Sequence, residues 1–69
     1  MRIKFKLKKE YIELNKLLKA TGLCATGGVA KVAIDQGYVK VDGETEFRKR
    51  RKVKKGQRVE TGEYIISVE

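Results

Sequence analysis

The residues from Leu14 to Gly43 constrain the fold most, because their pattern predicts two short helices followed at once by a strand and a tight turn. Leu14, Leu17 and Leu18 have the i, i+3, i+4 spacing of an apolar helix face. Gly22 comes shortly after them, and glycine readily takes the left-handed conformation that ends many helices. We therefore expect a first helix that ends at about Ala20, shortly before Gly22.

A second helix is predicted between Thr26 and about Gln36. The Thr26 hydroxyl can accept a hydrogen bond from an unpaired backbone N–H of the first turn, which makes it a suitable N-cap. Gly37 follows as a second C-terminal glycine, and Tyr38 to Val41 alternate into Asp42-Gly43, a strong hairpin-turn signal. The apolar residues expected to face the core from this helix are Val29, Ala30, Ala33 and Ile34.

Alternating segments on either side predict further strands. Arg2 to Lys8 place apolar and basic residues on opposite faces, which is typical of a half-buried strand. Lys9 to Ile12 form a predicted connector, and Glu44 to Phe47 form the strand that returns from the hairpin, with Phe47 as its core residue. A last strand is predicted from Tyr64 to Val68. The whole chain is thus expected to be an α+β fold.

Composition limits the function more than the fold. The chain has 69 residues, enough for a single domain spanning residues 1–69, and its net charge of +8 favours a polyanionic partner such as nucleic acid. Met1 is not followed by a continuous apolar stretch, so no signal peptide or membrane span is predicted. We expect a cytoplasmic, monomeric protein with no membrane contact, no cofactor and no small-molecule substrate.

A dense basic segment, residues 48–58, contains eight cations and no acidic residue. Val53 within it and Val59 directly after it are expected to face the core, so the segment is predicted to be structured. Arginines can bind phosphates with two parallel hydrogen bonds, and we expect the three early arginines to face solvent. The cations of the segment are Arg48, Lys49, Arg50, Arg51, Lys52, Lys54, Lys55 and Arg58. A solvated charged face is the alternative, but the mutual repulsion of so many cations favours polyanion binding.

Gly27 and Gly28 lie at the predicted start of the second helix, where an anion could approach backbone N–H groups and the positive end of the helix dipole. Lys31, one turn further on, could neutralise the same phosphate. The alternative is that the two glycines only permit a tight turn and close packing. Tyr38 could stack a base beside this surface, although a place in the hairpin core is the favoured interpretation.

Catalysis is not predicted, because the necessary residue types are missing. The chain has no histidine, and Ser67 is its only serine. Cys24 has no histidine base to activate it, so a small buried thiol is expected there. No cluster of acidic, histidine or cysteine side chains has the spacing of a metal site, and neither catalytic residues nor metal ligands are proposed.

The order of these elements resembles the RNA-binding domain named after ribosomal small-subunit protein four, the S-four domain. The residues that carry this resemblance are Leu14-Asn15, Leu18, Gly22-Leu23, Thr26, Ala30-Lys31, Ala33-Ile34 and Gly37 to Gly43. The stretches Gly27 to Lys31 and Arg48 to Lys52 further resemble the small stand-alone bacterial proteins of the YbcJ and YaaA type. The resemblance implies an αL-type RNA-binding motif, with two helices packed on a small, mostly antiparallel sheet.

The resemblance also implies binding to structured, often ribosomal, RNA and a ribosome-associated or assembly-linked role. Many S-four domains have arginine at the position of Gly27 and another basic residue at that of Glu13, so the usual contacts at the helix starts are partly lost here. The RNA-binding residues carried over are therefore Lys31, Arg48, Lys49, Arg50, Arg51 and Lys52, with Gly27 and Gly28 as a weaker addition. An interaction module for an acidic protein, or a nonspecific DNA binder, remains the alternative function.

Overall fold

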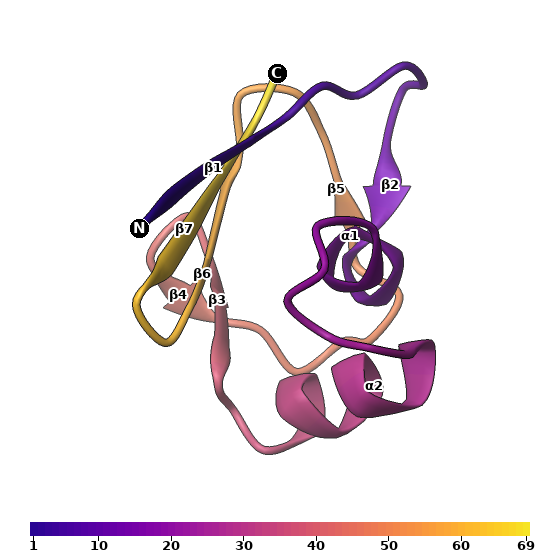
Figure 1. Cartoon of the computed structure of the whole chain (residues 1–69), viewed down its shortest axis with the longest axis vertical. Helices are drawn as coiled ribbons and strands as arrows, with labels where there is room; N and C mark the ends of the chain where they lie inside the picture. Colours follow the sequence, from indigo (N-terminus) through magenta and orange to yellow (C-terminus); the bar gives the residue numbers. More distant parts are fainter.

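The computed structural model describes residues 1–69 and contains two helices and seven strands (Figure 1). The helices are α1 (Leu14–Ala20) and α2 (Gly27–Asp35). The main sheet contains β1 (Arg2–Phe5), β3 (Val39–Val41), β4 (Glu44–Thr45), β6 (Arg58–Thr61) and β7 (Tyr64–Val68), in the order β1-β7-β6-β3-β4. A second, two-stranded sheet consists of β2 (Ile12–Glu13) and β5 (Lys52–Val53). All neighbouring strands are antiparallel except β1 and β7. The predicted α+β fold, with two helices on a mostly antiparallel sheet, is confirmed.

The helix boundaries follow from the capping residues that the sequence predicts. The Thr26 hydroxyl accepts a hydrogen bond of 3.1 Å from the N–H of Val29, so it caps the start of α2. Gly22 and Gly37, which follow the two helices, both have a φ of +81°. In the hairpin between β3 and β4, Asp42 has a φ of 52° and Gly43 a φ of 86°, as a type I′ turn requires.

One core joins the helices to the sheets. Its largest fully buried side chains come from α1, α2, β3, β5, β6 and β7, so every layer contributes to it. The thirteen buried residues are Leu7, Leu14, Leu17, Leu18, Cys24, Ala30, Ile34, Val39, Val41, Val53, Val59, Ile66 and Val68. Val53 and Val59 are fully buried, which confirms that the basic segment is anchored in the core. Neither helix is long and apolar enough to span a membrane.

Three apolar residues predicted to be buried are exposed. Tyr38 is 64% exposed, because Val39 faces the core and the alternation along a strand turns its neighbour outward. Phe47 is 60% exposed, and its ring instead approaches the backbone of Gly37 at the end of α2. Val29 is exposed because consecutive helix residues point about 100° apart, and Ala30 and Ile34 already fill the core side of α2.

The edges of the sheet also differ from the predicted strands. Strand β1 ends at Phe5 rather than at Lys8, although Leu7 remains buried. The returning strand β4 comprises only Glu44–Thr45, since Glu46 turns inward and takes the place expected for Phe47. The predicted connector ends in β2, whose pairing with β5 places Ile12 opposite Val53. That pairing fixes the basic segment beside α1.

Candidate nucleic-acid interface

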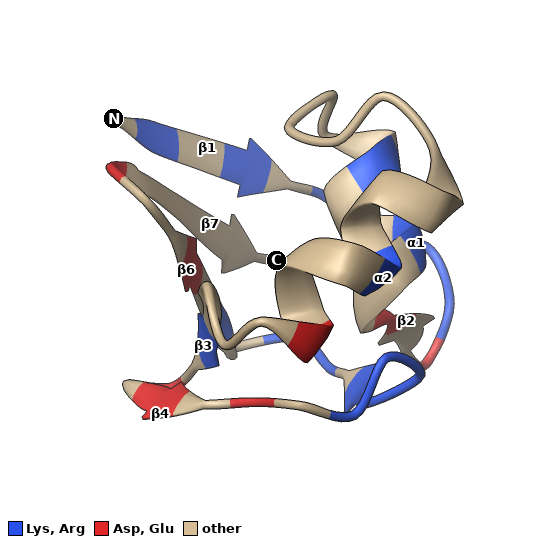
Figure 2. Ribbon diagram, turned by 90° about the horizontal axis from the view of Figure 1, so that it is seen from below, with Lys and Arg blue, Asp and Glu red and all other residues tan.

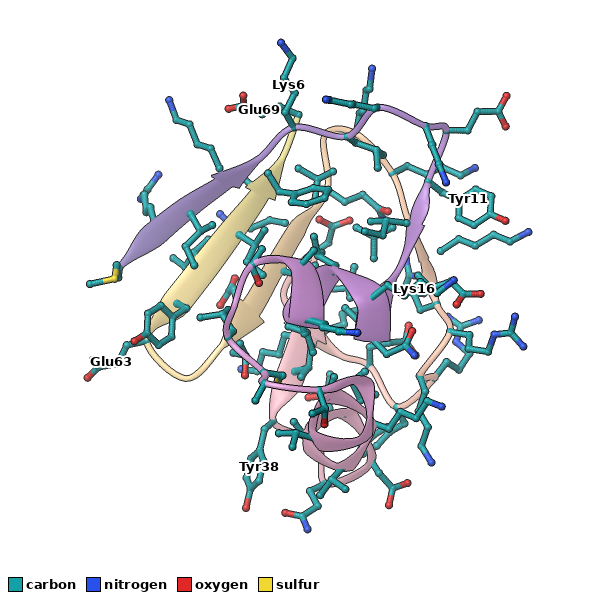
Figure 3. All side chains as sticks on the ribbon, turned by 45° about the vertical axis from the view of Figure 1, so that its right-hand side comes forward. Lys6, Tyr11, Lys16, Tyr38, Glu63 and Glu69 are labelled. Atoms are coloured by element: carbon teal, nitrogen blue, oxygen red, sulfur yellow. The ribbon has the colours of Figure 1, made fainter.

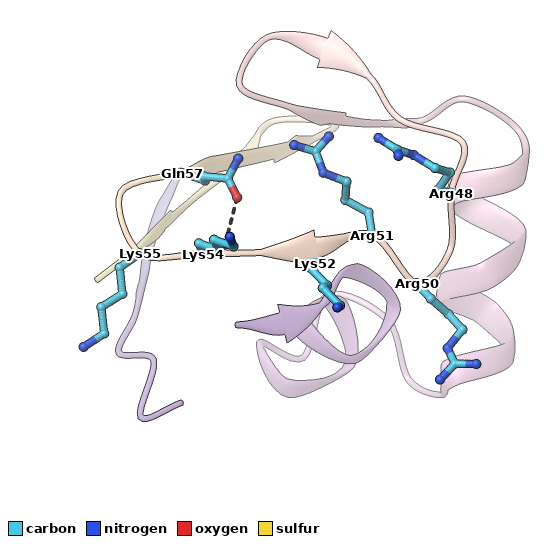
Figure 4. Close-up of a pocket in the computed structure, with 7 residues that line it drawn as sticks. All are labelled: Arg48, Arg50, Arg51, Lys52, Lys54, Lys55 and Gln57. Atoms are coloured by element: carbon cyan, nitrogen blue, oxygen red, sulfur yellow. Dashed lines mark hydrogen bonds between the residues drawn. The ribbon is translucent and has the colours of Figure 1, made fainter. Parts of the chain in front are cut away.

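Residues of the basic segment line an open groove, here called the basic groove. Figure 2 shows Lys and Arg gathered along the connection between β4 and β5, on the opposite side of the molecule from the cations of β1. The groove has a volume of about 780 Å³ and no apolar lining side chain. Its lining residues, drawn in Figure 4, are Arg48, Arg50, Arg51, Lys52, Lys54, Lys55 and Gln57.

Backbone hydrogen bonds hold this segment against the start of α1. The N–H of Leu14 donates to the carbonyl oxygen of Arg51 at 2.8 Å, and the N–H of Asn15 donates to that of Lys49 at 3.1 Å. These two N–H groups belong to the first turn of α1, where a helix has no internal acceptors for them. The segment therefore satisfies two N–H groups of the helix start with its own carbonyl groups, and these two N–H groups are not available to an external anion.

A buried carboxylate, Glu46, organises the first part of the segment. Glu46 is only 7% exposed and accepts four hydrogen bonds. Three come from Arg48, through its backbone N–H, Nε and Nη2, each at 3.0 Å. The fourth comes from Nη1 of Arg51 at 2.6 Å. The hydrogen bonds from Arg48, reinforced by the one from Arg51, lower the pKa of Glu46 to about 2 although burial opposes this shift.

The other two arginines of the segment also have acidic partners. Arg50 Nε lies 3.0 Å from a carboxylate oxygen of Glu13, and Lys16 lies 3.6 Å from the other oxygen. The hydrogen bond from Arg50 holds the pKa of Glu13 below its usual range. Arg58 Nε lies 3.3 Å from Glu60.

The lysines of the segment differ from the arginines in this respect. All four arginines form ion pairs, whereas Lys49, Lys52, Lys54 and Lys55 form none and are exposed. Three carboxylates thus offset part of the charge of the eight cations, and the surplus lies on side chains with unoccupied N–H donors. The groove therefore remains a site of strong positive potential.

The structure corrects the expectation that three arginines face solvent. Arg48 and Arg50 do so, but the side chain of Arg51 is only 28% exposed because it turns towards the buried Glu46. Reversing the charge of all three arginines would leave Glu46 without its partners and surrounded by further carboxylates. Such a triple variant is therefore expected to lose stability, and it cannot serve as a clean test of ligand binding.

Lys31, Gly27 and Gly28 lie on α2 and do not line the basic groove. Lys31 is exposed and has no ion-pair partner. The N–H groups of Gly27 and Gly28 donate no hydrogen bond within the protein. A Cβ atom at Gly27 would meet no atom within 4 Å, and one at Gly28 would meet only Thr26 Oγ1 at 3.7 Å, so packing does not require glycine at either position.

Two residues of this surface were missed by the sequence analysis. Glu46 could have been noticed as an acid immediately before a run of arginines, at spacings of two and five residues. Tyr11 lies under the ammonium group of Lys52, whose Nζ is 4.9 Å from the ring centroid. Tyr38 is thus not the only aromatic residue to consider beside the cations, and the contact between Tyr11 and Lys52 depends on the β2–β5 pairing.

The remaining candidate for chemistry, Cys24, lies in the core. It is buried and forms no disulfide, and burial raises the pKa of its thiol, which favours the protonated form. The structure thus supports the predicted small buried thiol. No group of three His, Cys, Asp or Glu side chains lies close enough together to hold a metal ion.

Two short helices on a mostly antiparallel sheet, with the basic segment fixed against the first helix, define the class of small αL-motif proteins. The chain belongs to the S4 domain family, whose model matches residues 5–69. This match confirms the resemblance to the S-four domain that the sequence indicates.

Similar proteins are known from enteric bacteria. The chain is 44% identical over 61 residues to "Putative RNA-binding protein YbcJ" of Escherichia coli (strain K12), covering 88% of this chain and 87% of that protein. It is equally similar to "Uncharacterized protein YbcJ" of Shigella flexneri. The solution structure of YbcJ from E. coli, described as having an αL motif involved in RNA binding, covers 94% of this chain and 84% of that chain with a TM-score of 0.73. The predicted similarity to the YbcJ type is confirmed.

Proposed function

We propose that this protein binds structured RNA through the basic groove. The observation that carries the proposal is a groove lined by six cations and one glutamine, with no apolar side chain, on an αL motif. The similarity to YbcJ, whose structure is described as having a motif involved in RNA binding, supports RNA as the polyanion. Phosphate contacts account for most of the nonspecific affinity of such surfaces.

Arginines and lysines have different tasks in this proposal. Glu46 and Glu13 hold Arg48 and Arg50 in fixed positions, so these guanidinium groups lose little side-chain entropy when a phosphate binds. Arg51 supports Glu46 from the partly buried side. Lys49 and Lys52 bring unpaired ammonium groups to the same edge of the protein, as do Lys54 and Lys55 further along the groove.

The start of α2 provides a second contact in the same proposal. Free N–H groups at Gly27 and Gly28 can donate to a phosphate oxygen, and Lys31 can add a charge-assisted hydrogen bond one turn further on. Neither glycine is needed for packing, which favours this role over the alternative of a tight turn.

The RNA is proposed to be folded rather than extended, because the groove has no aromatic lining on which successive unpaired bases could stack.

A ribosome-associated role follows from the family resemblance and belongs to the same proposal. Sedimentation of the tagged protein through a sucrose gradient tests it: the protein should travel with ribosomal subunits at low salt and leave them when the salt concentration is raised.

A salt titration with matched charge variants tests the RNA proposal. Lys54→Gln combined with Lys55→Gln removes two unpaired cations from the groove, and Arg2→Gln combined with Lys4→Gln removes two exposed cations from β1. For an RNA hairpin, the wild type should give a slope of about −3 to −5 for the logarithm of the binding constant against that of salt. The groove variant should flatten this slope by about 1 to 2, and the β1 variant should leave it almost unchanged.

The same titration separates the alternatives. Equal loss in both double variants would show that only overall charge matters and would count against the groove. A DNA duplex of the same sequence that binds as tightly as the RNA at every salt concentration would favour a nonspecific DNA binder. Failure of both nucleic acids to bind at low salt would favour an acidic protein partner.

A further inference from the structure

Next to the basic groove lies a second groove whose chemistry is different, here called the tyrosine groove. It has a volume of about 610 Å³ and includes the loop between β1 and β2 and the first turn of α1. Four apolar side chains line it, those of Phe5, Leu7, Tyr11 and Ile12. Tyr11 is 39% exposed, so part of its ring is accessible from the solvent.

Cations surround the apolar side chains of the tyrosine groove. Lys6, Lys8 and Lys9 line the groove from the β1–β2 loop, and Lys16 lines it from α1. Its only acidic side chain is Glu13, whose carboxylate is already paired with Arg50 and Lys16. An aromatic side chain surrounded by lysines suits a ligand that has a flat, apolar ring and a negatively charged group beside it. A nucleotide of an RNA chain has this chemistry.

Two contacts connect the tyrosine groove to the basic groove. Lys52 lines the basic groove and also covers one face of the Tyr11 ring, with its Nζ 4.9 Å from the centroid. Glu13 lines the tyrosine groove and binds Arg50, which lines the basic groove. An RNA strand with its phosphates in the basic groove can therefore bring a neighbouring nucleotide to Tyr11 without leaving the positive surface.

Tyr38 gives an internal comparison. It is more exposed than Tyr11, but its neighbours in a shallow depression on α2 are Thr26, Gly28, Val29, Val32, Ala33 and Gln36, none of which is charged. Figure 3 shows Tyr11 close to Lys16 and Tyr38 on a different part of the surface. Charge complementarity therefore distinguishes Tyr11 from Tyr38, and exposure alone does not.

We propose that Tyr11 stacks one unpaired base of the RNA whose phosphates occupy the basic groove, while lysines of the tyrosine groove contact the phosphate of that nucleotide. The proposal rests on the RNA-binding function proposed above and makes it more specific. The preferred ligand is then a helix interrupted by a bulge or a junction, rather than a continuous duplex or an extended strand. A single stacked base does not require the row of aromatic residues that single-strand binders use.

Two RNA hairpins test this proposal, identical except that one has a single unpaired 2-aminopurine in its stem. The wild-type protein should bind the bulged hairpin about 5- to 150-fold more tightly, the range expected for one base stacked on an aromatic ring. The fluorescence of the 2-aminopurine should fall on binding, because stacking quenches it. Tyr11→Leu should abolish both the preference and the quenching, whereas Tyr11→Phe and Tyr11→Trp should keep them.

Tyr38→Leu is the matched control, since it removes an exposed tyrosine whose depression on α2 is lined by no charged residue, and it should behave as the wild type. Equal affinity of the wild type for the two hairpins, or a preference that survives in Tyr11→Leu, would overturn the stacking proposal while leaving RNA binding intact. If the wild-type protein binds neither hairpin, the proposed function itself would be refuted. A competition experiment compares a Glu-rich peptide that contains one Phe with the same peptide without Phe. If only the peptide with Phe displaces the bulged hairpin, the tyrosine groove would be assigned to an acidic protein and the proposal overturned.

Discussion

Two parts of the basic segment, the arginine half (residues 48–51) and the lysine half (residues 52–55), are both rich in cations but have different surroundings. Between residues 48 and 51, three arginines are tied to two carboxylates, and one of these carboxylates is buried. Between residues 52 and 55, three lysines are exposed and have no acidic partner. A run of cations in a sequence thus contains residues that fix the backbone as well as residues available to a ligand. Mutations in the arginine half should therefore change stability as well as affinity, whereas mutations in the lysine half should change mainly affinity.

The largest effect is expected for Glu46→Ala. This substitution removes the carboxylate that accepts four hydrogen bonds from Arg48 and Arg51. The side chain of Arg51 is partly buried and would lose its acidic partner. Hydrogen bonds to charged groups contribute about 1.5 to 3 kcal/mol, so the free energy of unfolding should fall by about 2 to 3 kcal/mol. Chemical denaturation followed by circular dichroism measures this change.

Glu44→Ala is the matched control for that substitution. Glu44 lies two residues earlier, is exposed and forms no ion pair, so its removal should change stability by less than about 0.5 kcal/mol. Similar stability of the two variants would show that the Glu46 cluster does not hold the segment in place. The proposed difference in role between the arginine half and the lysine half of the segment would then be wrong.

The pH dependence of stability is a second measure of the arginine half. The pKa of Glu46 is about 2 in the folded protein, compared with an ordinary value of 4.5, so its pairing stabilises the folded state above pH 4.5. This contribution should disappear progressively as the pH falls from 4.5 to 2. Denaturation curves at several pH values should therefore show that the difference between wild type and Glu46→Ala shrinks over this window. A difference that stays constant would contradict the ion-pair explanation.

The sequence predicted the elements that depend on local chemistry. Thr26 as an N-cap, Gly22 and Gly37 as helix ends and the Asp42-Gly43 turn all follow from backbone preferences within a few residues. The burial of Val53 was also predicted from the sequence, since an isolated apolar residue among cations is expected to face the core. These features, together with the family resemblance, were sufficient for the fold.

Long-range pairing explains most of what the sequence did not predict. The contact between Tyr11 and Lys52 requires the pairing of two strands of two residues each, which are too short to give an alternating pattern. The exposure of Tyr38 and Phe47 reflects a core too small to cover every large apolar residue. For the proposed binding residues, the sequence predicted a cluster of cations, and the structure brings six cations of the basic segment together in one groove. It could not show which cations in that cluster are already paired within the protein.

Lys31→Ala extends the comparison to α2, since Lys31 is unpaired like the lysines of the segment but lies outside the basic groove. If it contacts a phosphate of the same RNA, its loss should weaken binding by about 1 kcal/mol, roughly fivefold, without changing stability. Lys4→Ala, on β1, removes the same charge at a remote exposed position. Fluorescence anisotropy with a labelled hairpin should therefore distinguish the two variants, and equal weakening would remove α2 from the interface.

The smallest effect, and the most specific to geometry, is expected for Gly27→Ala. The new methyl group would meet no atom within 4 Å, and alanine favours the helical conformation, so stability should rise by about 0.4 to 1 kcal/mol. The same methyl group would obstruct the approach of a phosphate to the N–H groups at the start of α2, a contribution of about 0.3 to 1 kcal/mol. RNA affinity should therefore fall by about two- to fivefold in a protein that has become more stable. Because the two changes have opposite signs, a loss of affinity in this variant cannot be attributed to unfolding, and unchanged affinity would show that the phosphates contact only the basic groove.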